Sequence, residues 1–316
     1  MQKCLNSKLQ TGMSKPIKIG TRDSELATWQ AKTVASKLQG LGHETEIVFI
    51  KSDGDLDLTT PLPEMGGKGV FTKALDDALL DGRIDVAVHS YKDLPTKNPL
   101  PLVVSAVMER EDPRDSLVAP KGIEFLDDES VSAIIATSSN RRKAQWLHRY
   151  PNHQITNIRG NVNTRLRKTE ENNWNGAIFA AAGLKRINLD HHIAQYLDWM
   201  VPAPAQGAMA VMVRDSDEEM ITITKNLNHR ETELCTRLER ELLNEMEAGC
   251  SAPVGAFAQI EGKDITLYAV ALTIDGSLQY DIEITKPIEE AEGTGRVAGR
   301  KLLEQGAAKL VEELRK

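Results

Sequence analysis

Residues 133 to 183 read AIIATSSNRRKAQWLHRYPNHQITNIRGNVNTRLRKTEENNWNGAIFAAAG, and this stretch decides the fold class. Three short runs that contain apolar residues, at 133–139, 154–160 and 176–183, read as strands. The two segments between them, 140–150 and 161–172, read as helices. Strands that alternate with helices are typical of βαβ units, so the stretch predicts an α/β unit with a parallel-type sheet.

The chain before this stretch shows the same alternation. An apolar run beginning at Ile17 leads through an N-cap at Ser24 into a helix that lasts until Gly40, and 44–52 reads as a second strand. A helix at 70–82 is followed by buried strands at 84–90 and 100–108. Residues 53–69, rich in Gly, Pro and Asp, predict a long mobile loop. We therefore expect another α/β unit, to which the apolar run 202–214 returns.

The last third of the chain follows a different pattern. After a helical stretch at 226–248, apolar residues alternate at period two around Gly turns, and a final helix follows. This pattern is typical of a small antiparallel α+β domain. The expected organisation is an N-terminal tail (1–15), a first domain (16–108 and 205–225), a second domain (109–204) and a third domain (226–316).

Composition restricts the class of protein. The 316 residues are 41% hydrophobic, enough to bury a core in each of two or three domains. The three cysteines, Cys4, Cys235 and Cys250, have unrelated spacings, which argues against a disulfide framework or a structural zinc site. No run of about 18 apolar residues and no signal peptide is evident. We expect a soluble cytoplasmic protein without a metal.

Charge is segregated along the chain. The net charge is −7, yet residues 137–190 contain ten Lys or Arg and only three Asp or Glu. A basic island on an acidic protein favours a cleft for an anionic small molecule, because nucleic-acid binding usually comes with a basic domain.

Basic residues in the island gather where predicted strands lead into helices. Segments 137–142 and 159–168 each place arginines beside a helix N-terminus, where open α/β sheets bind ligands and free backbone N–H groups favour anions. A guanidinium suits this role because it can donate two hydrogen bonds to one carboxylate or phosphate. The alternative for each arginine is a solvated helix face.

Three other motifs are candidates for chemistry. GGKG at 66–69 does not match a nucleotide P-loop, although Lys68 could close over an anion. VAVHSYKDLP at 86–95 delivers His89, Ser90, Lys92 and Asp93 to a sheet edge, and the alternative for Asp93 is a turn residue before Pro95. Cys250 is either functional, a small buried hydrophobe or an incidental loop residue, whereas Cys235 fits helix packing.

Nine ordered segments together resemble the porphobilinogen deaminase family, also called hydroxymethylbilane synthase. They are IGTRDSELATWQA, GGKGVFTKALDDALL, DVAVHSYKDLPT, EREDPRDSLV, TSSNRRKAQ, RGNVNTRL, AAAGLKRI, PAPAQGAMAV and EAGCSAPVGAFA. The resemblance covers nearly all of residues 16–316. It implies two periplasmic-binding-protein-like α/β domains plus a C-terminal α+β domain with a small antiparallel sheet.

The resemblance also implies an activity. The family joins four porphobilinogen molecules head to tail, with loss of ammonia, into the linear tetrapyrrole hydroxymethylbilane. The chain grows on a dipyrromethane cofactor that a cysteine holds through a thioether, which assigns Cys250 as the anchor. Each pyrrole carries an acetate and a propionate, so the basic island would hold a polyanion. We expect a monomer that binds porphobilinogen and neither nucleic acid nor membrane.

Site residues follow from the same resemblance. Asp93 aligns with the family's catalytic aspartate, which stabilises cationic pyrrole nitrogens. The residues implied to bind the cofactor are Cys250, Lys92, Ser90, Ser139, Arg141, Arg142 and Gly160. Those implied to bind substrate are Arg22, Ser24, Lys68, Phe71, Arg159, Arg165, Arg186 and Gln206.

Two departures and one alternative accompany the resemblance. Asp53 stands where some relatives have arginine, and Asn140 stands where leucine is common. A noncatalytic anion-binding or regulatory protein on the same two-domain scaffold is the main alternative, because fold does not fix function. Such a protein would need neither Cys250 nor Asp93.

Overall fold

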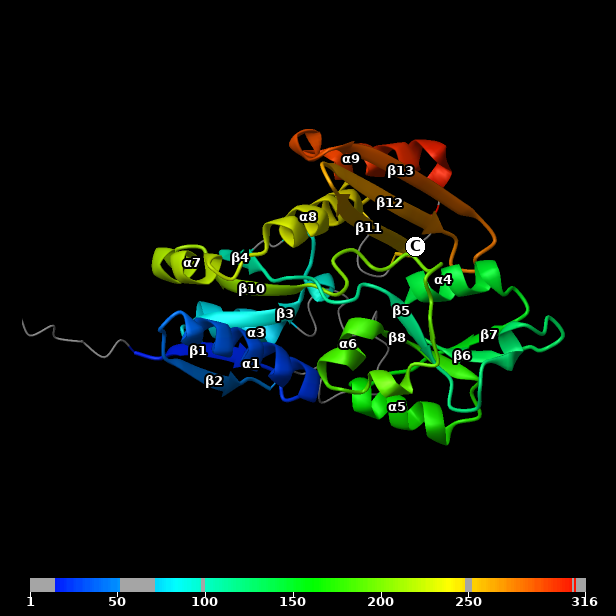
Figure 1. The fold of residues 1–316 in the computed structure, drawn as a ribbon, viewed down its shortest axis with the longest axis horizontal. Helices are drawn as coiled ribbons and strands as arrows, with labels where there is room; N and C mark the ends of the chain where they lie inside the picture. The colour runs from blue at the N-terminus through cyan, green and yellow to red at the C-terminus, as the bar shows by residue number, and fades with distance from the viewer. Residues whose placement is uncertain (1–14, 52–71, 98–99, 248–251, 309, 311–316) are drawn as a thin grey trace, which may run out of the picture.

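The computed structural model describes residues 15–51, 72–97, 100–247, 252–308 and 310 (Figure 1). Three sheets organise these residues. Figure 1 shows the first sheet beside the second, with the third lying above both. The loop predicted at 53–69, almost all of the predicted tail, and the positions Asp53, Lys68, Phe71 and Cys250 lie outside the described residues.

The first sheet has the order β2-β1-β3-β10-β4. β1, β2 and β3 are parallel, as the predicted parallel-type sheet requires, and β10 runs antiparallel to both of its neighbours, so the sheet is mixed. Helices α1 and α7 pack on one face and α3 on the other. The bounds are β1 Ile17–Thr21, α1 Glu25–Gly40, β2 Thr45–Phe49, α3 Lys73–Leu80, β3 Val86–Ser90, β4 Leu102–Val107, β10 Met209–Arg214 and α7 Glu218–Lys225.

The second sheet repeats this plan with the order β7-β6-β8-β5-β9. β6, β7 and β8 are parallel, and β5 is antiparallel to β8. Helix α4 packs on one face, and α5 and α6 pack on the other. The pattern of apolar runs did not predict β5 or β9. The bounds are β5 Asp115–Val118, β6 Ile134–Ala136, α4 Asn140–Arg149, β7 Gln154–Thr156, α5 Val162–Glu171, β8 Gly176–Ala180, α6 Ala181–Arg186 and β9 Gln195–Tyr196.

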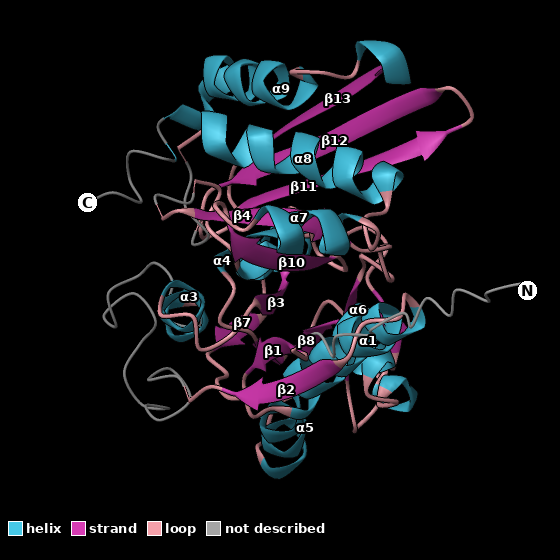
Figure 2. Cartoon of the chain, turned by 90° about the vertical axis from the view of Figure 1, so that its left-hand side faces the viewer, coloured by secondary structure: helices cyan, strands magenta, loops and turns pink. Residues whose placement is uncertain are grey.

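The third sheet is antiparallel, with the order β11-β12-β13. Figure 2 shows α8 and α9 lying against one face of it, and their apolar residues share one core with the strands. The fold class predicted from the sequence, two α/β units and a small α+β unit, is confirmed. The bounds are α8 Arg230–Glu245, β11 Val254–Glu261, β12 Asp264–Leu272, β13 Gln279–Pro287 and α9 Thr294–Leu302. Short helical turns are η1 Tyr91–Asp93, η2 Glu124–Leu126, η3 Asp190–His192, η4 Ile288–Glu290 and η5 Leu303–Ala307.

The chain passes twice between the first two sheets, from β4 to β5 and from β9 to β10. A fully buried carboxylate, Glu239 of α8, ties both passages to the third sheet. It accepts hydrogen bonds from the guanidinium of Arg110 at 2.6 and 3.2 Å, from the backbone N–H of Ala205 at 2.6 Å and from that of Ala258 at 2.8 Å. The Glu239 carboxylate therefore links the third sheet to both segments that connect the first two sheets.

Candidate active site

The N-terminus of α4 carries two buried arginines. Ser139 is the N-cap, and its Oγ accepts the backbone N–H of Arg142. The guanidiniums of Arg141 and Arg142 turn inward and share the carboxylate of Asp115, at 2.6 and 2.9 Å. They also donate to backbone oxygens, Arg141 to Val201 at 2.8 Å and Arg142 to Ile178 at 2.7 Å. This part of the basic island is therefore built into the core.

Asp115 is the carboxylate that makes this burial possible. Its side chain has no exposed surface, and burial alone would disfavour its charged form. The two guanidiniums outweigh burial and hold the pKa of Asp115 well below its usual range. Burial in turn lowers the pKa of Arg142. Three charges thus lie together inside the protein, with an excess of one positive charge.

Gln206 connects this cluster to the first sheet. Its side-chain amide donates to Asp115 at 3.0 Å and to the backbone oxygen of Pro113 at 2.8 Å, and its Oε1 accepts from Lys92 Nζ at 3.0 Å. Burial lowers the pKa of Lys92 to about 8, and the nearby Arg142 adds to the effect. Gln206 itself is fully buried, so its amide is engaged with protein groups.

Asp93 lies in the turn η1 that follows β3, next to Lys92. Its side chain is exposed, and its charge acts on the neighbouring Lys92 and on Arg165 of α5. Ser90, at the end of β3, accepts a hydrogen bond from the amide of Gln30 at 2.9 Å. The adjacent His89 is buried, and burial lowers its pKa to about 4, so the ring is neutral at pH 7.

The N-terminus of α5 has a more open arrangement. Gly160 adopts a φ of +117°, a left-handed conformation that other residues rarely adopt. Its carbonyl accepts from Arg165 Nε at 2.8 Å. Arg159 and Arg165 are half-buried, and burial lowers the pKa of Arg165 to about 10 with Arg142 contributing. The α4 arginines share a carboxylate in addition to their backbone partners, whereas the partner of Arg165 is a backbone oxygen.

The remaining predicted residues lie at α1 and α6. Ser24 caps α1, with its Oγ accepting the backbone N–H of Ala27 at 3.3 Å. Arg22 precedes it and is half-buried. Arg186 is buried, donates to the backbone oxygen of Gly207, and lies 5.7 Å from the Trp29 ring. Burial lowers its pKa to about 10.

The structure therefore places Lys92 and Arg165 within electrostatic range of both Asp93 and Arg142, and Lys92 also within range of Arg141. Sequence reasoning missed Asp115, on which the α4 arginines depend. The signal was available as an acidic residue directly after an arginine in PRDSLV, but nothing local distinguishes that aspartate from a surface one. Gln30, the partner of Ser90, was missed for the same reason.

Two family models match the chain. The dipyromethane cofactor binding domain of porphobilinogen deaminase matches residues 17–222, and the C-terminal domain of porphobilinogen deaminase matches residues 233–304. The porphobilinogen deaminase of Syntrophomonas wolfei is 41% identical over 304 residues, covering 95% of this chain and 99% of that one. That of Chlorobium luteolum is 39% identical, covering 96% and 99%.

Likeness to solved structures is looser. A nutrient binding protein from Burkholderia cenocepacia has a TM-score of 0.41 at 14% identity, covering 66% of this chain and 89% of that one. A TRAP periplasmic solute binding protein from Pseudomonas putida has a TM-score of 0.40 at 11% identity, covering 74% and 82%. Among the described residues, no helix has the length and apolar character needed to cross a membrane. The two family models and the relatives of about 40% identity establish that this chain belongs to the porphobilinogen deaminase family.

Proposed function

We propose that this chain polymerises four porphobilinogen molecules head to tail into hydroxymethylbilane and releases ammonia at each addition. One observation carries the proposal beyond family membership. An exposed carboxylate, Asp93, lies within electrostatic range of Lys92, Arg142 and Arg165, which come from both α/β units. Such a site can hold an anionic chain while it stabilises positive charge on the reacting pyrroles. The proposed setting is a monomer in the cytoplasm.

The described residues fit a polyanionic dipyrromethane. Lys92, Arg141, Arg142 and Arg165 outnumber the carboxylates Asp93 and Asp115. In addition, Nε of Arg141 is buried and has no hydrogen-bond partner among the described residues, so an acceptor is missing there. When bound, dipyrromethane supplies the primer to which porphobilinogen units are added.

We assign the residues two kinds of role. Cofactor carboxylates would be held by Lys92, Arg141 and Arg142, with Ser90, Ser139 and Gly160 shaping the site. Arg22, Ser24, Arg159, Arg165, Arg186 and Gln206 are proposed to serve the incoming substrate, together with Lys68 and Phe71. Asp93 is proposed to act through its negative charge, which stabilises cationic pyrrole nitrogens.

Cys250 is proposed as the covalent anchor. A thiolate is the nucleophile needed to form a thioether, and burial raises the pKa of Cys235 to about 12, which keeps that thiol protonated. Cys235 also packs in the core of α8 and the third sheet. The chemistry therefore favours Cys250 over Cys235.

Two pairs of variants test the proposal. Cys250→Ser should fold but give no colour in an aldehyde test for pyrroles on denatured protein, whereas Cys235→Ser should stain normally. Asp93→Asn should keep the covalent pyrrole but form hydroxymethylbilane roughly a hundredfold more slowly, because it loses the charge and keeps the size. Normal staining of Cys250→Ser would refute the anchor. Wild-type turnover in Asp93→Asn would make Asp93 only a turn residue.

A further inference from the structure

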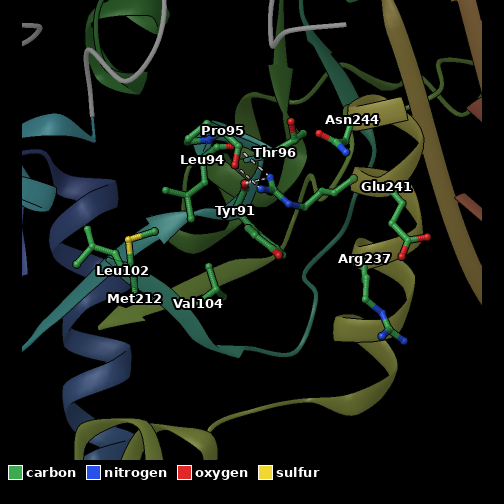
Figure 3. Close-up of a pocket in the computed structure, with 11 residues that line it drawn as sticks. Tyr91, Leu94, Pro95, Thr96, Leu102, Val104, Met212, Arg237, Glu241 and Asn244 are labelled. Carbon is green, nitrogen blue, oxygen red and sulfur yellow. Dashed lines mark hydrogen bonds between the residues drawn. The ribbon is translucent and has the colours of Figure 1, made fainter. Parts of the chain in front are cut away.

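A cavity of about 280 Å³ lies behind the turn that carries Asp93, between the first sheet and α8. Figure 3 shows Tyr91, Leu94 and Pro95 of the turn facing Arg237, Glu241 and Asn244 of α8 across this cavity. Leu102, Val104 and Met212 form its apolar side. The turn therefore faces α8, a helix that packs on the third sheet.

One side chain of α8, Arg240, reaches across to the turn. Its Nη1 donates to the backbone oxygens of Tyr91 at 3.2 Å and Leu94 at 3.0 Å, and its Nη2 donates to that of Pro95 at 2.6 Å. The guanidinium also lies 4.3 Å from the centre of the Tyr91 ring, a cation–π distance. Three of the carbonyls that flank Asp93 are thus held by one cation.

Besides the side-chain contacts of Lys92 with Gln206 and of buried Leu94, the backbone of the turn has few hydrogen bonds. Its first residue donates a backbone hydrogen bond to Ala208 at 3.0 Å, and Leu94 donates to Tyr91 at 3.3 Å, which is long. Leu94 is buried, so its carbonyl cannot readily turn to water if the guanidinium is removed. The backbone direction at Asp93 therefore depends on a residue from another unit of the fold.

We propose that Arg240 is a positioning residue for the Asp93 carboxylate, holding it at the geometry that the reaction needs. The proposal rests on the role proposed above for Asp93. Among the described residues, Arg240 has no hydrogen bond or ion pair with Asp93, Lys92 or Arg165, so it acts through the backbone of the turn. In the sequence, α8 (Arg230–Glu245) ends five residues before Cys250, the proposed anchor.

The chain offers a matched control one turn earlier in the same helix. Arg237 lines the same cavity and is exposed, and it makes no hydrogen bond or ion pair with a described residue. Arg237→Ala therefore removes the same charge from the same helix face without touching the turn. Arg240→Lys keeps the charge but loses the planar fork that reaches three carbonyls.

The test compares Arg240→Ala, Arg240→Lys and Arg237→Ala in the full chain carrying its covalent pyrrole. Hydrogen–deuterium exchange of the peptide containing residues 91–96 should speed up in Arg240→Ala, less so in Arg240→Lys, and not in Arg237→Ala. For porphobilinogen turnover, Arg240→Ala should lower kcat roughly tenfold to a hundredfold with KM nearly unchanged, because small misplacements of a reacting group are costly. Pyrrole staining should be normal in all three.

Added guanidinium ion provides a second measurement. The cavity left beside the turn in Arg240→Ala should admit it, so millimolar guanidinium chloride should restore part of kcat in that variant and none in Arg237→Ala. Unchanged exchange at 91–96 together with wild-type kcat in Arg240→Ala would overturn the proposal. If the wild type made no tetrapyrrole, the proposed function would fail, while the exchange measurement would still decide whether Arg240 holds the turn.

Discussion

The starts of α4 and α5 carry similar basic motifs in the sequence but differ in the folded protein. Arg141 and Arg142 of α4 are buried and share Asp115, whereas Arg165 of α5 is half-buried and donates to the backbone oxygen of Gly160. The first pair is largely compensated within the protein. At the start of α5, the charge of Arg165 remains available to a ligand.

This difference teaches that a count of basic residues overstates the charge available to a ligand. Three of the ten cations in the basic island are paired with carboxylates that lie outside the island in the sequence, Arg141 and Arg142 with Asp115 and Lys185 with Asp112. A buried pair of this kind gives a rigid, oriented arrangement, at the cost of desolvating its charges. We infer that α4 fixes the geometry of the site and α5 supplies adaptable charge.

The largest expected effect is that of Asp115→Asn. It leaves two buried guanidiniums without their carboxylate, and breaking a buried pair costs roughly 3–5 kcal/mol. Urea denaturation measures the loss. The control is Asp77→Asn, which removes an exposed pair with Lys73 at 2.7 Å and should cost less than about 1 kcal/mol. Equal losses for the two variants would mean that the α4 arginines are not held by Asp115.

Arg165→Leu should have an intermediate effect, confined to binding. Loss of one hydrogen bond to a charged group weakens affinity by about 1.5–3 kcal/mol, so KM for porphobilinogen should rise roughly tenfold to a hundredfold. The melting temperature should change little. Arg167→Leu on the same helix removes only an exposed pair with Glu171 and serves as the control. A drop in stability without a change in KM would mean that Arg165, like the α4 arginines, serves the structure and does not bind substrate.

The smallest expected effect is a pH dependence at Lys92, which lies within electrostatic range of the α4 arginines. Its pKa of about 8 lies below the value of a free lysine, so the ammonium is lost as the pH rises through 8 and anion affinity falls with it. Between pH 7 and pH 8.5, the dissociation constant of the cofactor-free protein for a soluble dipyrromethane should rise roughly threefold to fourfold. Lys92→Arg should remove this rise, because a guanidinium remains charged there. A rise that persists in Lys92→Arg would assign it to another group.

Patterning predicted the alternating strands and helices from β6 to β8, because each of these elements has a local apolar signature. It missed β5, whose first residues, Asp115 and Ser116, are polar yet fully buried. Local patterns read such residues as exposed, since their partners come from distant parts of the chain. The same non-local pairing hid the burial of Arg141 and Arg142. Motif resemblance predicted the residues of the candidate site, but their burial and charge partners could be read only from the folded structure.

The junction at Glu239 has a consequence for how the protein unfolds. Both passages between the α/β units and strand β11 donate to this one carboxylate. If any single unit melted, it would strip a partner from a buried charge in the units that remain, which raises the free energy of every partly unfolded state. The shared carboxylate therefore couples the unfolding of each unit to that of the other two.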